Sequence, residues 1–466
     1  MSEKKISLLE ASIVLIVIIL SISVSVIGLK LSPNISILLA ISLIMIYVIA
    51  RRLPLNVINK GIEKGLQPGI IPIFIFLLVG ALISVWIQAG IIPTLMVVGF
   101  KLLSVKWFVP SVFLVCAIVG SAVGSAFTVM STIGIAFFGI GATLGLNEAL
   151  VVGAIVSGSV FGDKMSPLSE STNLASAIVG ADLFKHIKHM MWSTLPAFVV
   201  SLIAFAILGF NDSQADLGNI KEVSAVLESH FNISLMSLLP ILFMLFCAWK
   251  KIPAVITILL NVLLGIVMTL IHNPAVGFKT IAKVVETGFV SQTGDQQIDA
   301  LLTRGGINSM MPTVLLIILT LSLGGILMEL GLVSTVIGAI ANKLNSAKSL
   351  IIVTLLSGIG VNLFIGEQFL SVILPGNAFK GEFQKLRLDP VVLSRTLEDG
   401  GTVINYLIPW GIAGSFVANT FGVPTLVYLP FALFSLLSPV FSVISALTGL
   451  GVDYLPEEKA SEPSTI

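Results

Sequence analysis

Long apolar runs, separated by short polar segments, follow one another along almost the whole chain. A run of about 17–25 apolar residues is long enough to cross a bilayer as an α-helix. We place spanning helices near 8–29, 33–50, 69–88, 147–180, 190–209, 233–249, 253–272, 311–329, 389–421 and 424–448, with breaks inside 147–180 and 389–421. The pattern therefore predicts an all-α polytopic membrane protein.

Two further stretches, 107–145 and 349–383, are long and carry glycines and polar residues near their middle, at 120–125 and 360–367. Glycine and polar side chains weaken a membrane helix where they gather. Each stretch is therefore either one long helix or a re-entrant hairpin with a polar tip.

A weak internal repeat relates the two halves of the chain. With an offset of 242 residues, Gly124 meets Gly366, Phe127 meets Phe369 and Pro167 meets Pro409. The same offset holds over about 60 residues, which makes a chance match unlikely. We therefore predict two homologous halves, 1–210 and 233–450, joined by a linker at 211–232.

The distribution of lysine and arginine predicts the orientation, because cytoplasmic loops carry the excess of these residues. Lys4 and Lys5 place the N-terminus in the cytoplasm, Lys385 is also inside, and the acidic linker 211–232 lies outside. These assignments to the two sides of the membrane are mutually consistent only if 107–145 and 349–383 each enter and leave on the same side, as hairpins. Each half then has five crossings plus a hairpin, and an odd number of crossings makes the halves inverted repeats. We expect the acidic tail at 451–466 to be cytoplasmic, and to be disordered from Asp453 onward.

Composition narrows the class of protein further. The chain is 56% hydrophobic and only 11% charged, whereas soluble domains carry about 25% charged residues. The net charge of +1 gives no electrostatic footprint for nucleic acid. Cys116 and Cys247 lie in apolar runs and indicate neither a disulfide framework nor a metal site. The sequence also lacks a His-x-x-x-His or Gly-x-Ser-x-Gly motif, so we expect neither an enzyme nor a bound cofactor.

A polar stretch at 157–173 interrupts one apolar run and contains Asp163, Lys164 and Glu170. A charged side chain at membrane depth costs about 2.5–3.5 kcal/mol on insertion scales, so it marks a functional site. Gly162 and Pro167 favour a break in the helix, which frees backbone carbonyl groups. Carboxylate, hydroxyl and carbonyl oxygens are the hard ligands that a small cation prefers. Transporters place substrate and ion sites at such breaks.

The run from Gly162 to Ala175, Gly-Asp-Lys-Met-Ser-Pro-Leu-Ser-Glu-Ser-Thr-Asn-Leu-Ala, resembles the signature of the NhaC-type sodium/proton antiporters. This family includes malate/lactate antiporters and belongs to the ion-transporter superfamily. The run Leu397–Thr402 in the second half is also similar to that family, and the resemblance extends over roughly residues 10–450. It implies exchange of Na⁺ for H⁺ by alternating access across a bacterial cytoplasmic membrane.

Candidate site residues cluster at the predicted hairpin tips and helix breaks, which we expect to converge at the membrane midplane. In the first half they are Ser121, Ser125, Thr128, Ser157, Ser159, Asp163, Ser166, Glu170, Ser171, Thr172 and Asn173. In the second half they are Asn362, Glu367, Gln368, Arg395, Glu398, Asp399, Thr402 and Asn405. The first set is rich in hydroxyl groups and the second in carboxylates, and both supply oxygen ligands.

Exchange requires a carboxylate that binds either the cation or a proton, but not both. Asp163 is the first choice as the Na⁺ ligand, with Glu367, Glu398 and Asp399 as alternative or additional carriers. Lys164 is either a counter-charge displaced by the cation or a side chain that snorkels to the interface.

Arg395 has three interpretations: a partner of the nearby carboxylates, a clamp for an anionic substrate, or a cytoplasmic anchor. Of these we favour the anchor. Because no clear clamp for a carboxylate is visible, we favour Na⁺ and H⁺ as the transported ions over a small carboxylate such as malate or lactate. The sequence is compatible with a homodimer in the bilayer and does not decide the oligomeric state.

Overall fold

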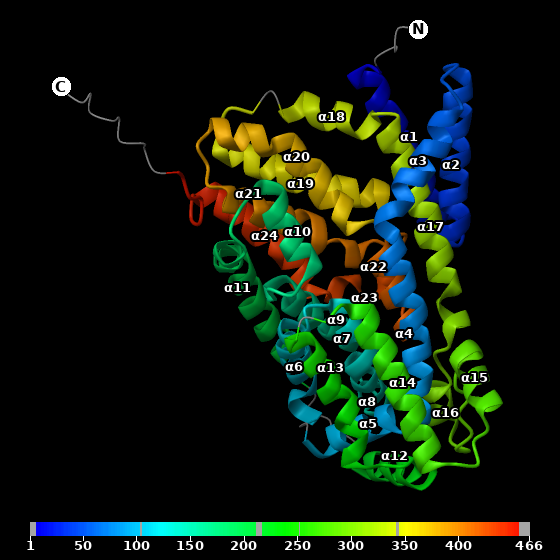
Figure 1. Ribbon diagram of the computed structural model, residues 1–466. Coiled ribbons are helices and arrows are strands. Elements are labelled where there is room, and N and C mark those ends of the chain that lie inside the picture. Colours follow the sequence, from blue (N-terminus) through cyan, green and yellow to red (C-terminus); the bar gives the residue numbers. More distant parts are fainter. Residues whose placement is uncertain (1–5, 103–104, 211–216, 251, 342–343, 456–466) are drawn as a thin grey trace, which may run out of the picture.

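The computed structural model describes residues 6–102, 105–210, 217–250, 252–341 and 344–455, and its regular structure in these ranges is helical (Figure 1). Nine of the described helices are long and apolar enough to cross a membrane, or up to 12 spans if each bent pair counts as one. The predicted all-α polytopic membrane protein is confirmed. Leu9, Ile207 and Trp249 illustrate the lipid-compatible surface, because each is at least 70% exposed.

The described residues of the first half contain eleven α-helices. They are α1 Leu8–Ser23, α2 Pro33–Ala50, α3 Asn56–Leu66, α4 Ile70–Gln88, α5 Ile91–Leu102, α6 Phe108–Val123, α7 Ala126–Val129, α8 Ile135–Thr143, α9 Glu148–Met165, α10 Glu170–Val179 and α11 Leu183–Leu208. The segment 51–68, which lies between two of the predicted spanning helices, contains α3, which runs into α4 as one helical stretch from Asn56 to Gln88.

The linker and the second half contain the remaining α-helices of the described residues. They are α12 Leu217–His230, α13 Leu239–Trp249, α14 Ala254–His272, α15 Phe278–Thr287, α16 Gln296–Leu302, α17 Ile307–Glu329, α18 Leu332–Ala341, α19 Ala347–Ile365, α20 Gln368–Lys385, α21 Pro390–Leu397, α22 Ile412–Phe421, α23 Thr425–Tyr428 and α24 Leu433–Thr448. Much of the predicted linker 211–232 is therefore helix α12, and 211–216 lies outside the described residues.

Helix bounds in the second half repeat those in the first half with an offset of 242 residues. The offset relates the end of α6 to the end of α19, the start of α9 to the start of α21, and both ends of α10 to both ends of α22. The left-handed glycines that end these helices also recur, Gly124 with Gly366 and Gly180 with Gly422. The helix breaks therefore fall at matching positions in the two halves.

Small residues allow the α3–α4 stretch to pack closely against α17. A Cβ added to Gly61 would lie 2.7 Å from Ile326 Cα, one added to Gly65 would lie 2.2 Å from the Leu321 carbonyl oxygen, and one added to Gly80 would lie 2.5 Å from the Gly306 carbonyl oxygen. Residue numbers rise along one helix as they fall along the other, so the two stretches run antiparallel. They form one of the contacts that join the two halves of the chain.

We expect Gly65→Ala to lower the thermal midpoint of the detergent-solubilised protein. Forcing a methyl group into a packed contact costs about 1–3 kcal/mol, although alanine normally favours a helix over glycine by about 1 kcal/mol. The matched control is Gly338→Ala in α18, where an added Cβ would meet no atom within 4 Å. A midpoint for Gly65→Ala equal to or above that of Gly338→Ala would contradict this account of the contact.

The first residues of the predicted disordered tail are ordered against the start of α21. The Asp389 N–H donates to the Asp453 carbonyl over 2.9 Å, and the Leu455 N–H donates to the Arg387 carbonyl over 2.8 Å. Leu388 and Tyr454 form an antiparallel bridge between them. The prediction of disorder is therefore wrong for 453–455, because backbone pairing satisfies these polar groups, and 456–466 lies outside the described residues.

Candidate ion-binding site

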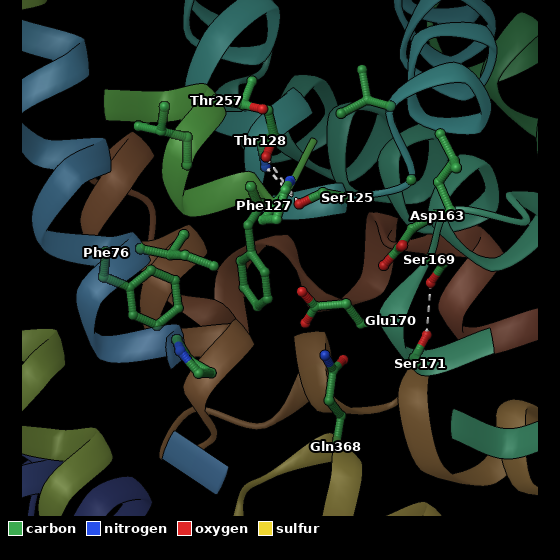
Figure 2. A pocket seen from close by; sticks show the side chains of 18 of the residues that line it. Phe76, Ser125, Phe127, Thr128, Asp163, Ser169, Glu170, Ser171, Thr257 and Gln368 are labelled. Carbon is green, nitrogen blue, oxygen red and sulfur yellow. Dashed lines mark hydrogen bonds between the residues drawn. The ribbon is translucent and has the colours of Figure 1, made fainter. Parts of the chain in front are cut away.

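One cavity of about 210 Å³ lies where the two sets of helix breaks meet (Figure 2). The first half contributes Ser125, Thr128, Asp163, Ser169, Glu170 and Ser171 to its wall, and the second half contributes Glu367, Gln368 and Asn405. Figure 2 shows Asp163, Ser169 and Glu170 on one side of this space, with Gln368 reaching toward Glu170 from another. The remaining wall is largely apolar and includes Phe76, Phe127 and Ile258.

The break between α9 and α10 places Asp163 and Glu170 at the cavity. Pro167 favours extended backbone in the preceding residue, and Ser166 is extended with ψ 131°. The helices on either side differ in direction by 44°. Ser169 begins α10 as its N-cap, and its hydroxyl group lies beside the Asp163 carboxylate. The predicted broken helix therefore brings a carboxylate, a hydroxyl group and a second carboxylate together.

The two predicted tips, at the ends of α6 and α19, have the same local backbone conformation. Gly124 and Gly366 end α6 and α19 with φ of +71° and +68°, a conformation that glycine adopts without a steric cost. Each is followed by an N-cap: Ser125 accepts from the Thr128 N–H over 3.3 Å, and Glu367 accepts from the Leu370 N–H over 2.7 Å. The first tip therefore presents a hydroxyl group where the second presents a carboxylate.

The second broken helix reaches the cavity through Asn405 and Ile412. Residues Glu398–Thr402 form a π-helical turn, a feature that is common at functional sites. Beyond it, the Asn405 amide donates to Asn362 Oδ1 over 2.8 Å and accepts from the Ala413 N–H over 2.8 Å. The Asn362 amide in turn donates to the Gly401 carbonyl. This network fixes the start of α22, whose first residue, Ile412, lines the cavity.

Lys164 and Asp399 form a buried ion pair outside the cavity lining. Asp399 Oδ1 also accepts from the hydroxyl groups of Ser438 over 2.7 Å and Ser193 over 3.0 Å. The interpretation that Lys164 snorkels to the interface is wrong, because the residue is only 2% exposed. Its charge is instead neutralised inside the protein by a carboxylate from the other half of the chain.

Arg395 joins α21 to the C-terminal end of α24. Its guanidinium group donates to the Gly451 carbonyl and to Ser445 Oγ, both over 2.9 Å. The favoured interpretation as a cytoplasmic anchor is wrong, because Arg395 is 0% exposed and holds buried groups. Arg395 also does not line the cavity, so its position does not suit a clamp for a substrate held there.

Several predicted site residues do not line this cavity and instead hold the surrounding helices. The Thr172 hydroxyl group donates to the Lys164 carbonyl over 3.1 Å, and the Asn173 amide donates to the carbonyls of Pro167 and Ser169 over 2.9 and 2.7 Å. Glu398 accepts from the Thr402 hydroxyl group over 2.5 Å. The others away from the cavity lining are Ser121, Ser157, Ser159, Ser166 and Asn362.

Sequence reasoning missed Ser193 and Ser438, the two hydroxyl partners of Asp399. A signal for the second was present, because Ser435, Ser438, Ser442 and Ser445 share one face of α24 at helical spacing. Serines in an apolar helix usually donate to a backbone carbonyl of their own helix. The spacing alone therefore did not indicate that Ser438 contacts a buried carboxylate.

Comparison with known proteins identifies the family. The model of the Na⁺/H⁺ antiporter family matches residues 158–450. The chain is 40% identical to the Na⁺/H⁺ antiporter NhaC of Alkalihalophilus pseudofirmus, over 91% of this chain and 92% of that one. It is 34% identical to NhaC of Bacillus subtilis, over 89% and 92% of the two chains. It is 33% identical to the malate-2H⁺/Na⁺-lactate antiporter of Bacillus subtilis, over 86% and 85%. The chain therefore belongs to the Na⁺/H⁺ antiporter family.

Proposed function

We propose that this protein exchanges Na⁺ for H⁺ across a bacterial cytoplasmic membrane. The observation that carries the proposal is a cavity lined by Asp163, Glu170 and Glu367 together with hydroxyl and amide groups from both halves of the chain. Two relatives that align with most of the chain are named as Na⁺/H⁺ antiporters, which supports the same function.

The chemistry of the cavity favours exchange over simple binding. An unneutralised carboxylate is costly where part of the wall is apolar, so it binds either a proton or a cation. We assign Na⁺ to Asp163, with Ser125, Ser169 and Glu170 as neighbouring oxygen ligands. Because Na⁺ and H⁺ compete for the same carboxylate, loading one ion releases the other, and the two are not carried together through Asp163.

Alternating access between inverted halves is the mechanism we propose. It is supported by the recurring helix bounds and by the antiparallel packing of α4 against α17, two helices that the repeat makes equivalent. The equivalent helices α5 and α18 also lie toward opposite ends of the molecule (Figure 1). In this scheme both termini are cytoplasmic, and 107–145 and 349–383 are re-entrant hairpins.

Exchange coupled to a small carboxylate is the second candidate, because one relative is named as a malate-2H⁺/Na⁺-lactate antiporter. Recognition of a carboxylate normally uses a cation with free donors. Among the described residues that line the cavity there is no lysine or arginine. The nearby buried cations are already engaged, Lys164 by Asp399 and Arg395 by Gly451 and Ser445. The site therefore favours inorganic ions.

The test is proton flux in sealed proteoliposomes that contain the purified protein. We expect an imposed Na⁺ gradient to drive saturable proton movement, and we expect external malate or lactate to leave its rate unchanged. Empty vesicles give the leak rate. Accumulation of labelled malate or lactate, driven by either ion gradient, would instead establish the second candidate.

A further inference from the structure

The two half-helices that begin at the cavity, α10 and α22, end in the same way. Each is followed by a left-handed glycine, Gly180 or Gly422, with φ of +79° or +75°. Carbonyl groups in the last turn of a helix have no partner within it and form the negative end of its dipole. A cation that donates to such a carbonyl stabilises the helix end.

Each of these helix ends receives a cation from another element. Lys380 Nζ, on α20, donates to the Ile178 carbonyl in α10 over 2.9 Å. Arg304 Nη1, between α16 and α17, donates to the Thr420 carbonyl in α22 over 3.0 Å. Ile178 and Thr420 are separated by 242 residues, so the repeat relates the two accepting carbonyls.

The two cations do not occupy equivalent positions in the repeat. Phe138 of α8 occupies the position equivalent to Lys380, and the Arg304 guanidinium carbon lies 5.3 Å from the centre of the Phe138 ring. The first half therefore carries an aromatic ring where the second half carries the lysine. Arg304, which lies against this ring, supplies the positive charge that Phe138 lacks.

The segment that carries Arg304 is held by a network of its own. The Asp299 carboxylate accepts from the Thr293 N–H over 2.7 Å and from the hydroxyl groups of Ser291 and Thr293, both over 2.8 Å. The Thr293 N–H contributes most to holding the pKa of Asp299 below its usual range. The Phe289 N–H donates to the Arg304 carbonyl over 3.1 Å. Arg304 therefore reaches α22 from a fixed support.

We infer that Lys380 and Arg304 are paired positioning residues that hold the two cavity-lining half-helices from their far ends. Lys380 fixes α10, which presents Glu170 and Ser171 to the cavity, and Arg304 fixes α22, which begins at Ile412. Neither cation is among the residues that line the cavity. The inference rests on the proposed Na⁺/H⁺ exchange for its effect on transport, but the docking of the half-helices can be measured without transport.

Hydrogen–deuterium exchange of the full-length protein measures the docking directly. We expect Lys380→Met to speed exchange in 170–180 and not in 412–422, and Arg304→Met to speed it in 412–422 and not in 170–180. The conservative variants Lys380→Arg and Arg304→Lys keep a donor and a charge, so they should restore slow exchange. Lys385→Met, at the exposed end of α20, and Lys283→Met, at an exposed position of α15, are the matched controls.

The transport assay measures two quantities for each variant, the apparent KM for Na⁺ and the maximal rate of proton flux. Loss of a charged hydrogen bond at a helix end should raise the KM about three- to tenfold, with the maximal rate recovered at high Na⁺ and the KM restored in the conservative variants. If hydrogen–deuterium exchange in both methionine variants matches that in the controls, the inference is overturned. This result would not affect the proposed Na⁺/H⁺ antiport. Selective loss of protection without any Na⁺-driven flux in the wild type would support the docking role and overturn the proposed function instead.

Discussion

Asp163→Asn is expected to abolish Na⁺-driven proton movement, reducing it to the leak rate of empty vesicles. Asparagine has nearly the same shape as aspartate, but it neither releases a proton nor neutralises Na⁺. Asp163 lines the cavity beside the Ser169 hydroxyl group, and the amide can still occupy this position. The variant should therefore fold and insert, which size-exclusion chromatography in detergent will check.

A second Asp→Asn variant provides the control for that prediction. Asp389 caps the start of α21 by accepting from the Val391 N–H over 3.0 Å. The equivalent residue in the first half is Asn147, which caps α9 in the same way. Asp389→Asn should therefore transport normally. Wild-type flux in Asp163→Asn vesicles would remove Asp163 from the exchange mechanism.

Breaking the Lys164–Asp399 ion pair should have the largest effect on stability. Removing one partner leaves an uncompensated buried charge, which costs about 3–5 kcal/mol. Lys164→Met and Asp399→Asn should each lower the thermal midpoint of the solubilised protein strongly. The double variant removes both charges and should recover much of the loss.

Lys385→Met is the matched control for the ion pair. Lys385 Nζ lies 2.7 Å from Glu382, but the lysine side chain is 70% exposed. Exposed pairs contribute only about 0–1 kcal/mol, so its thermal midpoint should stay near that of the wild type. A double variant no more stable than the single variants would show that the two charges do not compensate each other.

Much of the fold could be predicted from the sequence, because apolar length and helix-breaking residues act locally. The runs at 8–29, 33–50 and 253–272 correspond closely to α1 with the turn that follows it, α2 and α14. The break near Pro167 was also predictable, since proline removes a donor and constrains the residue before it. The helix in segment 51–68 was harder to predict, because α3 packs through glycines and carries polar residues that interrupt the apolar pattern.

The candidate site could be predicted only in part. Asp163, Glu170, Ser125, Glu367 and Asn405 line the cavity, and each lies at a break or tip that glycine, proline or an offset match marked in the sequence. The partners of Lys164 and Arg395 could not be predicted. They depend on how α9, α11, α21 and α24 pack, and no spacing along the chain records which buried serine or carboxylate faces which cation.

Competition between Na⁺ and H⁺ at one carboxylate is the central claim, and Na⁺ binding with proton release in purified protein tests it most directly. We predict that adding Na⁺ to weakly buffered wild-type protein releases protons. On the acidic side, where the site is mainly protonated, the apparent Kd for Na⁺ should rise about tenfold for each unit of falling pH. Asp163→Asn should neither bind Na⁺ nor release protons. Na⁺ binding that is independent of pH, or proton release that persists in Asp163→Asn, would contradict the claim.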